Sequence, residues 1–288
     1  MHENVKEVEG PFFIVIEGID GSGKGTQARY LYDFVKRSYP HLNPVLTSEP
    51  TKGAVGKIVR EYLKEDGLEP EVLALLFAAD RLHHVCETIV PNLKKGRCVI
   101  SERYVYSSLV YQSVSGVDLR WLTEINRYSV IPDLVVYLSV PVSVARRRVA
   151  ERLEKERKKK SKRKKNLEFF EEKFLTFQED VAKAFESLLK GEMDVKIRSG
   201  GSMFDDFGKT NFVEVDGSKI PKIVHHHLIE VVDKLFSGRC PRLTNKYDYS
   251  LFPSRPSDIF KLKIPWLKEF INTRKTANGR RAIQKRLF

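Results

Sequence analysis

Phosphate chemistry is indicated by one glycine-rich segment, Gly18-Ile19-Asp20-Gly21-Ser22-Gly23-Lys24-Gly25-Thr26. It matches the phosphate-binding pattern G-x-x-x-x-G-K, except that Gly25 stands where a serine or threonine usually follows the lysine. Glycines let successive backbone N–H groups turn toward one anion, and Lys24 supplies a point charge for the β and γ phosphates of a nucleotide. We therefore expect a nucleotide site, with Thr26 or a shell of water molecules completing Mg²⁺ coordination. A plain glycine turn between a strand and a helix is the alternative.

A second group of candidates combines aromatic and charged side chains. Phe77 and Arg81 stand four residues apart, so on a helix they share one face, where a ring can stack on a base while a guanidinium holds a phosphate. An arginine rarely lies in an apolar helix without an anionic partner. Phe77 also fits a core stripe with Leu73 and Leu76, and that alternative stays open.

Five short apolar runs predict the strands that must position these residues, at 12–16, 44–47, 97–101, 134–139 and 211–215. A helical pattern follows the glycine-rich segment to about residue 38, and others cover roughly 54–65, 70–95, 104–128, 142–157, 167–190 and 219–237. This alternation predicts a parallel sheet covered on both faces. The candidate motifs directly follow strands, and ligands bind beyond the carboxyl ends of the strands in such sheets.

The net charge of +13 is concentrated in two segments. Residues 155–165 contain nine Lys/Arg and one acid, and residues 238–288 contain thirteen Lys/Arg and three acids, so the rest of the chain is mildly acidic. Three widely spaced cysteines indicate neither a disulfide framework nor a zinc site, and we expect a reducing, cytoplasmic setting. The apolar runs are strand-length, so no signal peptide or transmembrane span is expected.

Four segments, taken in order and spacing, carry a family resemblance. They are Ile16-Glu17-Gly18-Ile19-Asp20-Gly21-Ser22-Gly23-Lys24, Leu76-Phe77-Ala78-Ala79-Asp80-Arg81, Ser101-Glu102-Arg103-Tyr104 with Ser107-Ser108 and Tyr111-Gln112, and Pro132-Asp133-Leu134-Val135-Val136-Tyr137-Leu138. From Phe12 to about Phe236 the chain resembles thymidylate kinase, a family of nucleoside monophosphate kinases. The resemblance implies an α/β, P-loop NTPase-type three-layer sandwich with a five-stranded parallel sheet and a helical lid. It also implies ATP-dependent phosphorylation of dTMP to dTDP in deoxynucleotide biosynthesis, with Mg²⁺ and in a homodimer.

The resemblance also assigns roles. Catalysis is expected from Lys24, Glu102, Arg103 and Arg152. Glu102 stands where the family usually has an aspartate near magnesium, and it is expected to reach the metal directly or through water, with Thr26. A surface ion pair is the alternative for Glu102 and Arg103.

The resemblance implies which residues contact the acceptor dTMP. Phe77 lies against thymine, Arg81 and Arg103 hold the phosphate, Tyr111 excludes a 2′-hydroxyl, and the remaining contacts are Asp20, Pro50, Ser107, Ser108 and Gln112. The family commonly has Arg-Glu-Pro before the second helix, and Ser48 replaces that arginine here.

On the ATP side, residues 18–26 bind the phosphates, and the resemblance places Arg148 near adenine and Arg152 nearer the phosphates. The lid is expected at about 146–167, although a flexible basic loop that attracts anions is the alternative for 158–165. We predict a kinase-like domain at 1–237 with an insertion at about 191–210, and a basic extension at 238–288.

The sequence is also compatible with two alternative functions. Another nucleoside monophosphate kinase or a deoxynucleoside kinase would share the phosphate loop and the lid. In a different class, a nucleic-acid-associated P-loop protein would use the basic segments 155–165 and 238–288 for contact with a polyanion.

Overall fold

The computed structural model describes residues 8–64, 69–160, 168–190 and 211–238, with side chains described there except at 156–175. The predicted insertion, most of the lysine-rich run and the C-terminal extension after residue 238 therefore lie outside the described residues. Within the described part of the chain, no helix is both long enough and apolar enough to cross a membrane.

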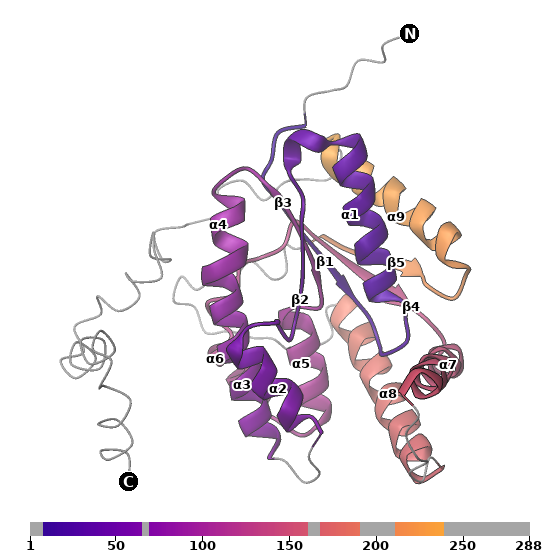
Figure 1. Cartoon of the computed structure of the whole chain (residues 1–288). Coiled ribbons are helices and arrows are strands. Elements are labelled where there is room, and N and C mark those ends of the chain that lie inside the picture. The colour runs from indigo at the N-terminus through magenta and orange to yellow at the C-terminus, as the bar shows by residue number, and fades with distance from the viewer. Residues whose placement is uncertain (1–7, 65–68, 161–167, 191–210, 239–288) are drawn as a thin grey trace, which may run out of the picture. The chain divides into compact units, whose positions relative to one another are not determined.

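Five parallel strands form the sheet, in the order β2-β3-β1-β4-β5 (Figure 1). They are β1 (Phe12–Glu17), β2 (Val45–Ser48), β3 (Cys98–Glu102), β4 (Leu134–Ser139) and β5 (Asn211–Asp216). In the register, Ile16 lies opposite Glu102, and Ser48 also lies opposite Glu102 from the other side. This alignment brings the carboxyl ends of β1, β2 and β3 to one edge, and it confirms the predicted parallel sheet.

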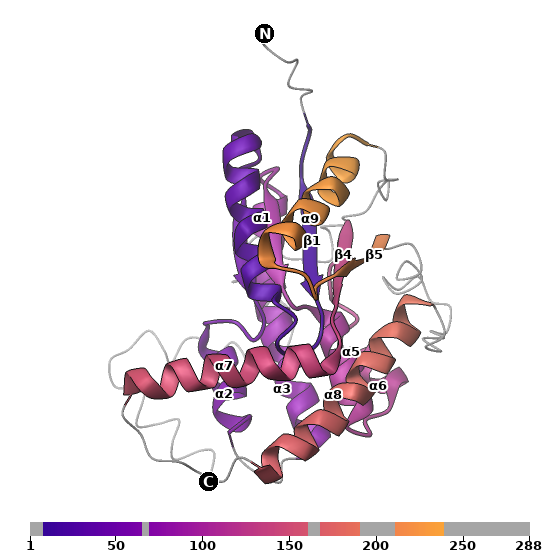
Figure 2. The ribbon, with the colours of Figure 1, turned by 90° about the vertical axis from the view of Figure 1, so that its right-hand side faces the viewer.

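Helices cover both faces of the sheet. One face carries α1 (Lys24–Ser38) and α9 (Pro221–Phe236). The other helices are α2 (Ala54–Tyr62), α3 (Pro70–His84), the π-helical turn η2 (Val85–Ile89), α4 (Val90–Leu93), α5 (Val105–Val114), α6 (Leu119–Ile125), α7 (Val142–Lys160) and α8 (Glu168–Leu189), with a short 3₁₀ turn at Pro40–Leu42. Figure 2 shows α7 and α8 at the carboxyl end of the sheet.

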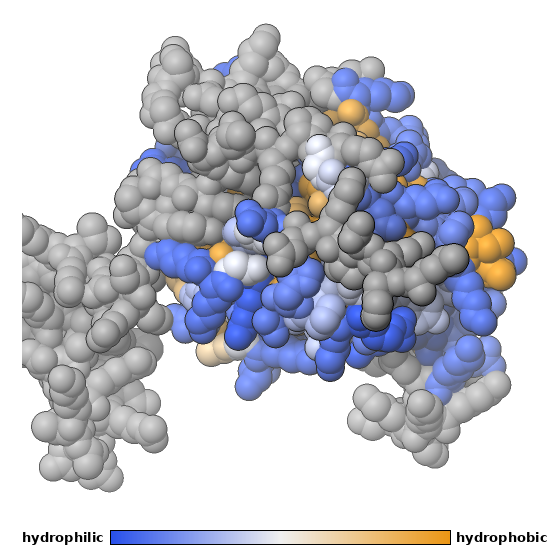
Figure 3. Space-filling view, turned by 90° about the horizontal axis from the view of Figure 1, so that it is seen from above, coloured by the Kyte–Doolittle hydropathy of each residue, from blue (hydrophilic) through white to orange (hydrophobic). Residues whose placement is uncertain are grey.

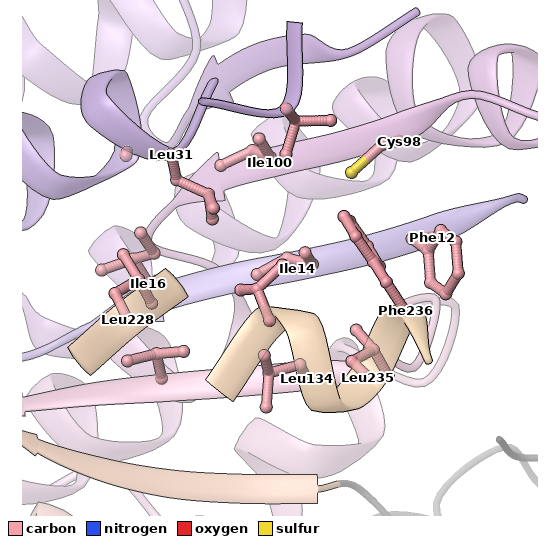
Figure 4. Packing of buried hydrophobic residues seen from close by; sticks show 14 of the residues in the cluster. Phe12, Ile14, Ile16, Leu31, Cys98, Ile100, Leu134, Leu228, Leu235 and Phe236 are labelled. Atoms are coloured by element: carbon pink, nitrogen blue, oxygen red, sulfur yellow. The ribbon is translucent and has the colours of Figure 1, made fainter. Parts of the chain in front are cut away.

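A large cluster of buried hydrophobic residues lies between the sheet and the α1/α9 layer. Alternate β1 residues Phe12, Ile14 and Ile16 point into it, as the period of two along a strand requires, and they meet Leu31 of α1 and Leu228 of α9 (Figure 4). Phe13 points to the opposite face and packs edge-on against Tyr104, with 5.0 Å between the two ring centroids. Because β1 is buried on both faces, the segment that follows it has a rigid base.

One predicted helix is broken, and another is continuous but contains a π turn. The predicted helix at 104–128 consists of α5 and α6, because Gly116 adopts a left-handed φ of 94° and Asp118 then caps α6 by accepting a hydrogen bond from Trp121 N at 2.8 Å. The predicted helix at 70–95 contains the π turn η2, where Pro91 cannot donate a hydrogen bond to the Glu87 carbonyl. Where the described residues are visible from the end at which β1 begins, their surface is mainly hydrophilic (Figure 3).

Candidate active site

The glycine-rich loop between β1 and α1 is held in a conformation that needs glycine. Gly21 has a φ of 88°, and a Cβ there would lie 2.3 Å from the Ala145 carbonyl oxygen. The loop wraps around Lys24, whose Nζ donates to the carbonyl oxygens of Gly18 at 2.9 Å and Ile19 at 2.7 Å. The interpretation of this segment as a phosphate loop is therefore supported by its geometry, with strand before and helix after.

Lys24 is buried, and burial together with the nearby charge of Arg103 lowers its pKa to about 7. The carboxylates of Asp20, Glu102 and Glu17 act in the opposite direction without restoring the usual value. A phosphate group placed at this loop would add negative charge and stabilise the protonated lysine. The electrostatics thus suit the binding of a polyphosphate.

Glu17, which the sequence reasoning did not single out, connects the phosphate loop to the β3–α5 turn. Its buried carboxylate accepts hydrogen bonds from Tyr104 N at 2.8 Å, Ser107 N at 3.2 Å and Ser107 Oγ at 2.6 Å. Burial raises the pKa of Glu17 above its usual value, although the hydrogen bonds from Ser107 Oγ and Tyr104 N and the charges of Arg103 and Lys24 act in the opposite direction. The turn that carries Arg103 is thereby fixed against the end of β1.

Arg103 lies at the centre of a cluster that links the loop to α5. It has a positive φ of 65°, and its backbone N–H donates to Ile16 O at 3.0 Å. Its guanidinium bonds to Asp20, donates to Ser107 Oγ at 3.0 Å and lies 5.0 Å from the ring centroid of Tyr111. Burial alone would raise the pKa of Asp20, but the charges of Arg103 and Lys24 hold it below its usual value. Four predicted site residues are therefore brought together.

Arg81 belongs to a different cluster. Its buried guanidinium donates to Glu49 Oε2 at 2.9 Å and to Ser108 Oγ at 2.8 Å, and it also bonds to Asn126. Glu49 is thus the anionic partner that an arginine in an apolar helix requires. Among the described residues, no hydrogen bond or ion pair joins Arg81 to the Lys24–Asp20–Arg103 cluster.

Two buried residues of α3 that the sequence reasoning did not single out, His84 and Asp80, hold the acceptor-side loop. His84 lies between Glu49 Oε1 at 3.0 Å and Thr47 Oγ1 at 2.6 Å. The Asp80 carboxylate accepts from Thr51 N and Thr51 Oγ1, both at 2.6 Å. Asp80, Arg81 and His84 are spaced on α3 so that all reach the end of β2, and this spacing was the available signal.

Phe77 and Gln112 have the surroundings of binding residues. Phe77 is only half-buried, so the alternative that it is a core residue is not supported. Gln112 is 5% exposed, and its Oε1 has no hydrogen-bond partner among the described residues. A buried amide oxygen without a partner is costly, so Gln112 is a candidate acceptor for a ligand N–H. Pro50, another predicted acceptor residue, has its carbonyl held by Arg60 Nη1 at 2.9 Å.

One arginine of α7 contacts the phosphate loop, and a second acts on it through its charge. Arg148 donates to Gly217 O at 2.9 Å and Ser218 O at 3.0 Å, and more weakly to Ser22 O, so it joins the loop to the β5–α9 connection. Arg152 is exposed, and its charge helps to lower the pKa of Asp20. Gln178 of α8, which the sequence did not suggest, accepts from Asp20 N at 3.1 Å.

Glu102 and Thr26 are suitable oxygen donors for magnesium. Mg²⁺ typically uses one or two carboxylates and keeps several waters, so an extensive protein ligand set is not required. Among the described residues, no group of three or more His, Cys, Asp and Glu side chains is placed to hold a metal. Glu102, Gly25 and Ser48 line a pocket of about 490 Å³ that can accommodate a hydrated ion. The residues present therefore fit magnesium.

Known proteins resemble this chain over most of the described residues. A family model described as thymidylate kinase matches residues 16–189. The chain is 50% identical over 150 residues to a probable thymidylate kinase of Thermococcus onnurineus, covering 49% of this chain and 72% of the relative. A probable thymidylate kinase of Methanococcus maripaludis is 38% identical over 225 residues, covering 77% of this chain and 96% of the relative. A crystal structure of thymidylate kinase from Ehrlichia chaffeensis has the same fold, with a TM-score of 0.55 and 24% identity over 78% of this chain and 99% of that one.

Proposed function

The chain belongs to the thymidylate kinase family and phosphorylates dTMP to dTDP, and from this premise we propose how its residues divide the work. ATP binds with its phosphates on the loop 18–26, and dTMP binds between α3 and α5. The observation that carries this assignment is the cluster of Lys24, Asp20, Arg103 and Tyr111, because it links the phosphate loop to the acceptor-side helix. Transfer occurs in line between the two nucleotides at this cluster.

On the donor side, backbone N–H groups of the loop and the start of α1 hold the β and γ phosphates, and Lys24 neutralises them. Arg148 borders the adenine, since it lies at the β5–α9 connection beside Ser22. Arg152 lies on the phosphate side, which its influence on Asp20 supports. Residues 146–167 act as the lid that excludes water over the reacting groups.

On the acceptor side, Arg103 binds the phosphate of dTMP at the point of transfer, and Ser107 keeps its guanidinium in place. Asp20 holds the other side of that guanidinium. Tyr111 packs against Arg103 and against the 2′ side of the sugar, where its ring leaves no room for a hydroxyl. This arrangement favours a deoxyribonucleotide.

At the base, Phe77 stacks on thymine and Gln112 Oε1 accepts the N3–H. We assign Arg81 to this end of the site instead of the phosphate end, because it bonds to Ser108, one turn before Gln112 on the same face of α5. Pro50 forms the wall of the base pocket, with its carbonyl fixed by Arg60.

Magnesium bound with ATP would neutralise charge on the β and γ phosphates. In this chain Glu102 would hold the ion, directly or through water, and Thr26 would supply a hydroxyl. The reaction needs no general base, because an ionised phosphate oxygen of dTMP is the nucleophile.

Two copies of the chain associate through the exposed apolar face of α3. Val72, Leu75 and Leu82 are 40%, 50% and 40% exposed, and their spacing of three and seven residues places them on one stripe. Because the chain resembles a family of homodimers, the proposed partner that covers this stripe is a second copy of the chain. The pocket for dTMP is formed by the other side of α3.

The direct test is ADP formation from ATP and magnesium, with dTMP, dUMP, AMP, CMP, GMP and thymidine offered in parallel. We expect dTMP to be the best acceptor and Lys24→Ala to abolish turnover. The matched variant Gln112→Leu removes the base acceptor and should narrow the preference for dTMP over CMP, whose N3 lacks a proton. A preference for thymidine or AMP in the original chain would move the function to a neighbouring kinase class.

A further inference from the structure

Two departures from the usual pattern lie side by side in the structure. Gly25 replaces the serine or threonine that ordinarily follows the phosphate-loop lysine, and Glu102 is one methylene longer than the aspartate expected at the end of β3. A Cβ on Gly25 would lie 2.8 Å from Glu102 Oε2 and 3.3 Å from both Glu102 Cδ and Oε1. The longer carboxylate therefore occupies the space that a side chain at position 25 would need.

The contact is local and adjustable. Gly25 is an ordinary helical residue of α1 and does not have the positive φ of Gly23. The atoms that a new Cβ would meet are at the free end of a flexible side chain, so a larger residue would displace the Glu102 carboxylate and leave the backbone unchanged. Substitution at 25 should thus act through Glu102 and not through the fold.

The same carboxylate also acts on the phosphate-loop lysine. Its charge acts on Lys24, and both Glu102 and Gly25 border the same pocket. A serine hydroxyl at position 25 would ordinarily supply one magnesium ligand, and here a carboxylate oxygen stands within van der Waals distance of that position.

We propose that Glu102 replaces the missing hydroxyl: Gly25 and Glu102 form a matched pair in which the longer carboxylate takes over the metal-facing position beside Lys24. The pair is a substitute for the usual combination of serine and aspartate. This proposal rests on the metal role assigned to Glu102 above, and it adds that the length of Glu102 and the absence of a side chain at 25 depend on each other.

The test measures metal binding as well as turnover. Mn²⁺ replaces Mg²⁺ as the probe, its affinity is measured by electron paramagnetic resonance in the presence of a non-hydrolysable ATP analogue, and thermal unfolding confirms that each variant is folded. We compare the original chain with Gly25→Ser, Glu102→Asp and the double variant. Each single change is expected to weaken Mn²⁺ binding by roughly tenfold, as disturbed metal surroundings commonly do. The double variant should recover to within about threefold of the original, because a hydroxyl and a short carboxylate again share the site.

Two further variants separate the causes. Gly25→Ala combined with Glu102→Asp relieves the steric collision without supplying a hydroxyl. Mn²⁺ binding by this double variant should therefore remain weak. Glu102→Gln keeps the length and removes the charge. If this change leaves Mn²⁺ affinity intact, the metal role of Glu102 fails, and the proposed pair fails with it. If it weakens binding but the effects of Gly25→Ser and Glu102→Asp simply multiply in the double variant, the metal role stands and the matched pair is refuted.

Discussion

Replacement of Glu49 by glutamine should destabilise the protein and weaken dTMP binding specifically. Glu49 is 5% exposed and bridges two buried groups, Arg81 at 2.8 Å and His84 at 3.0 Å. Glutamine keeps the volume but removes the charge, so the buried guanidinium of Arg81 loses its only ion-pair partner among the described residues.

The size of the effect follows from the contacts that remain. Removing one partner of a buried ion pair costs about 3–5 kcal/mol. Arg81 would still donate to Ser108 and Asn126, and the new amide oxygen can accept one hydrogen bond, so we expect the lower end, about 3 kcal/mol of unfolding free energy. If Arg81 lies at the base pocket, its displacement should raise the KM for dTMP and leave the KM for ATP nearly unchanged.

Urea denaturation followed by circular dichroism measures the stability, and coupled ADP formation measures both KM values. The matched control is Glu61→Gln on the exposed face of α2, which should change stability by less than about 0.5 kcal/mol. A loss for Glu49→Gln no larger than the control would refute the buried-pair reasoning. A large loss of stability with equal rises in both KM values would refute the assignment of Arg81 to the base.

Three further predictions concern other parts of the site. Burial and Arg103 lower the pKa of Lys24 from 10.5 to about 7. Between pH 7 and pH 10.5 the folded protein therefore binds fewer protons than the unfolded chain. As a result, Lys24 makes the free energy of unfolding rise with pH across that range. Urea unfolding at pH 7 and pH 9 should show a smaller rise in Lys24→Met, and equal rises would contradict the shift. Phe77→Ala should raise the KM for dTMP by about tenfold through lost stacking, with only a small loss in thermal stability, whereas a large stability loss at constant KM would return Phe77 to the core. Leu75→Glu should convert dimers to monomers in sedimentation experiments, because it places a charge in the apolar α3 stripe; an unchanged sedimentation coefficient would exclude this interface.

The chain's local patterns were sufficient for the elements and for the chemistry of the phosphate loop. The five strands were predicted because their apolar runs are short and are separated by helical patterns, and both neighbours of the loop, β1 and α1, follow from them. The break near Gly116 and the π turn η2 were missed, since the apolar pattern continues across them. The family resemblance, carried by motifs that are close in sequence, was confirmed by the family model and the relatives.

The partners of the charged side chains were decided only by tertiary structure. An arginine on an apolar helix predicts an anionic partner. The sequence did not identify that partner as Glu49, which follows β2. Nor did it predict that Arg81 and Arg103 lie in separate clusters. Likewise, Gly25 and Glu102 each read as an isolated departure, because contact between residues 77 positions apart depends on strand order and register. Spacing along one element determines which side chains share a face. Contacts between elements are determined by packing of the whole core. These contacts give the site its arrangement of charges and its shape.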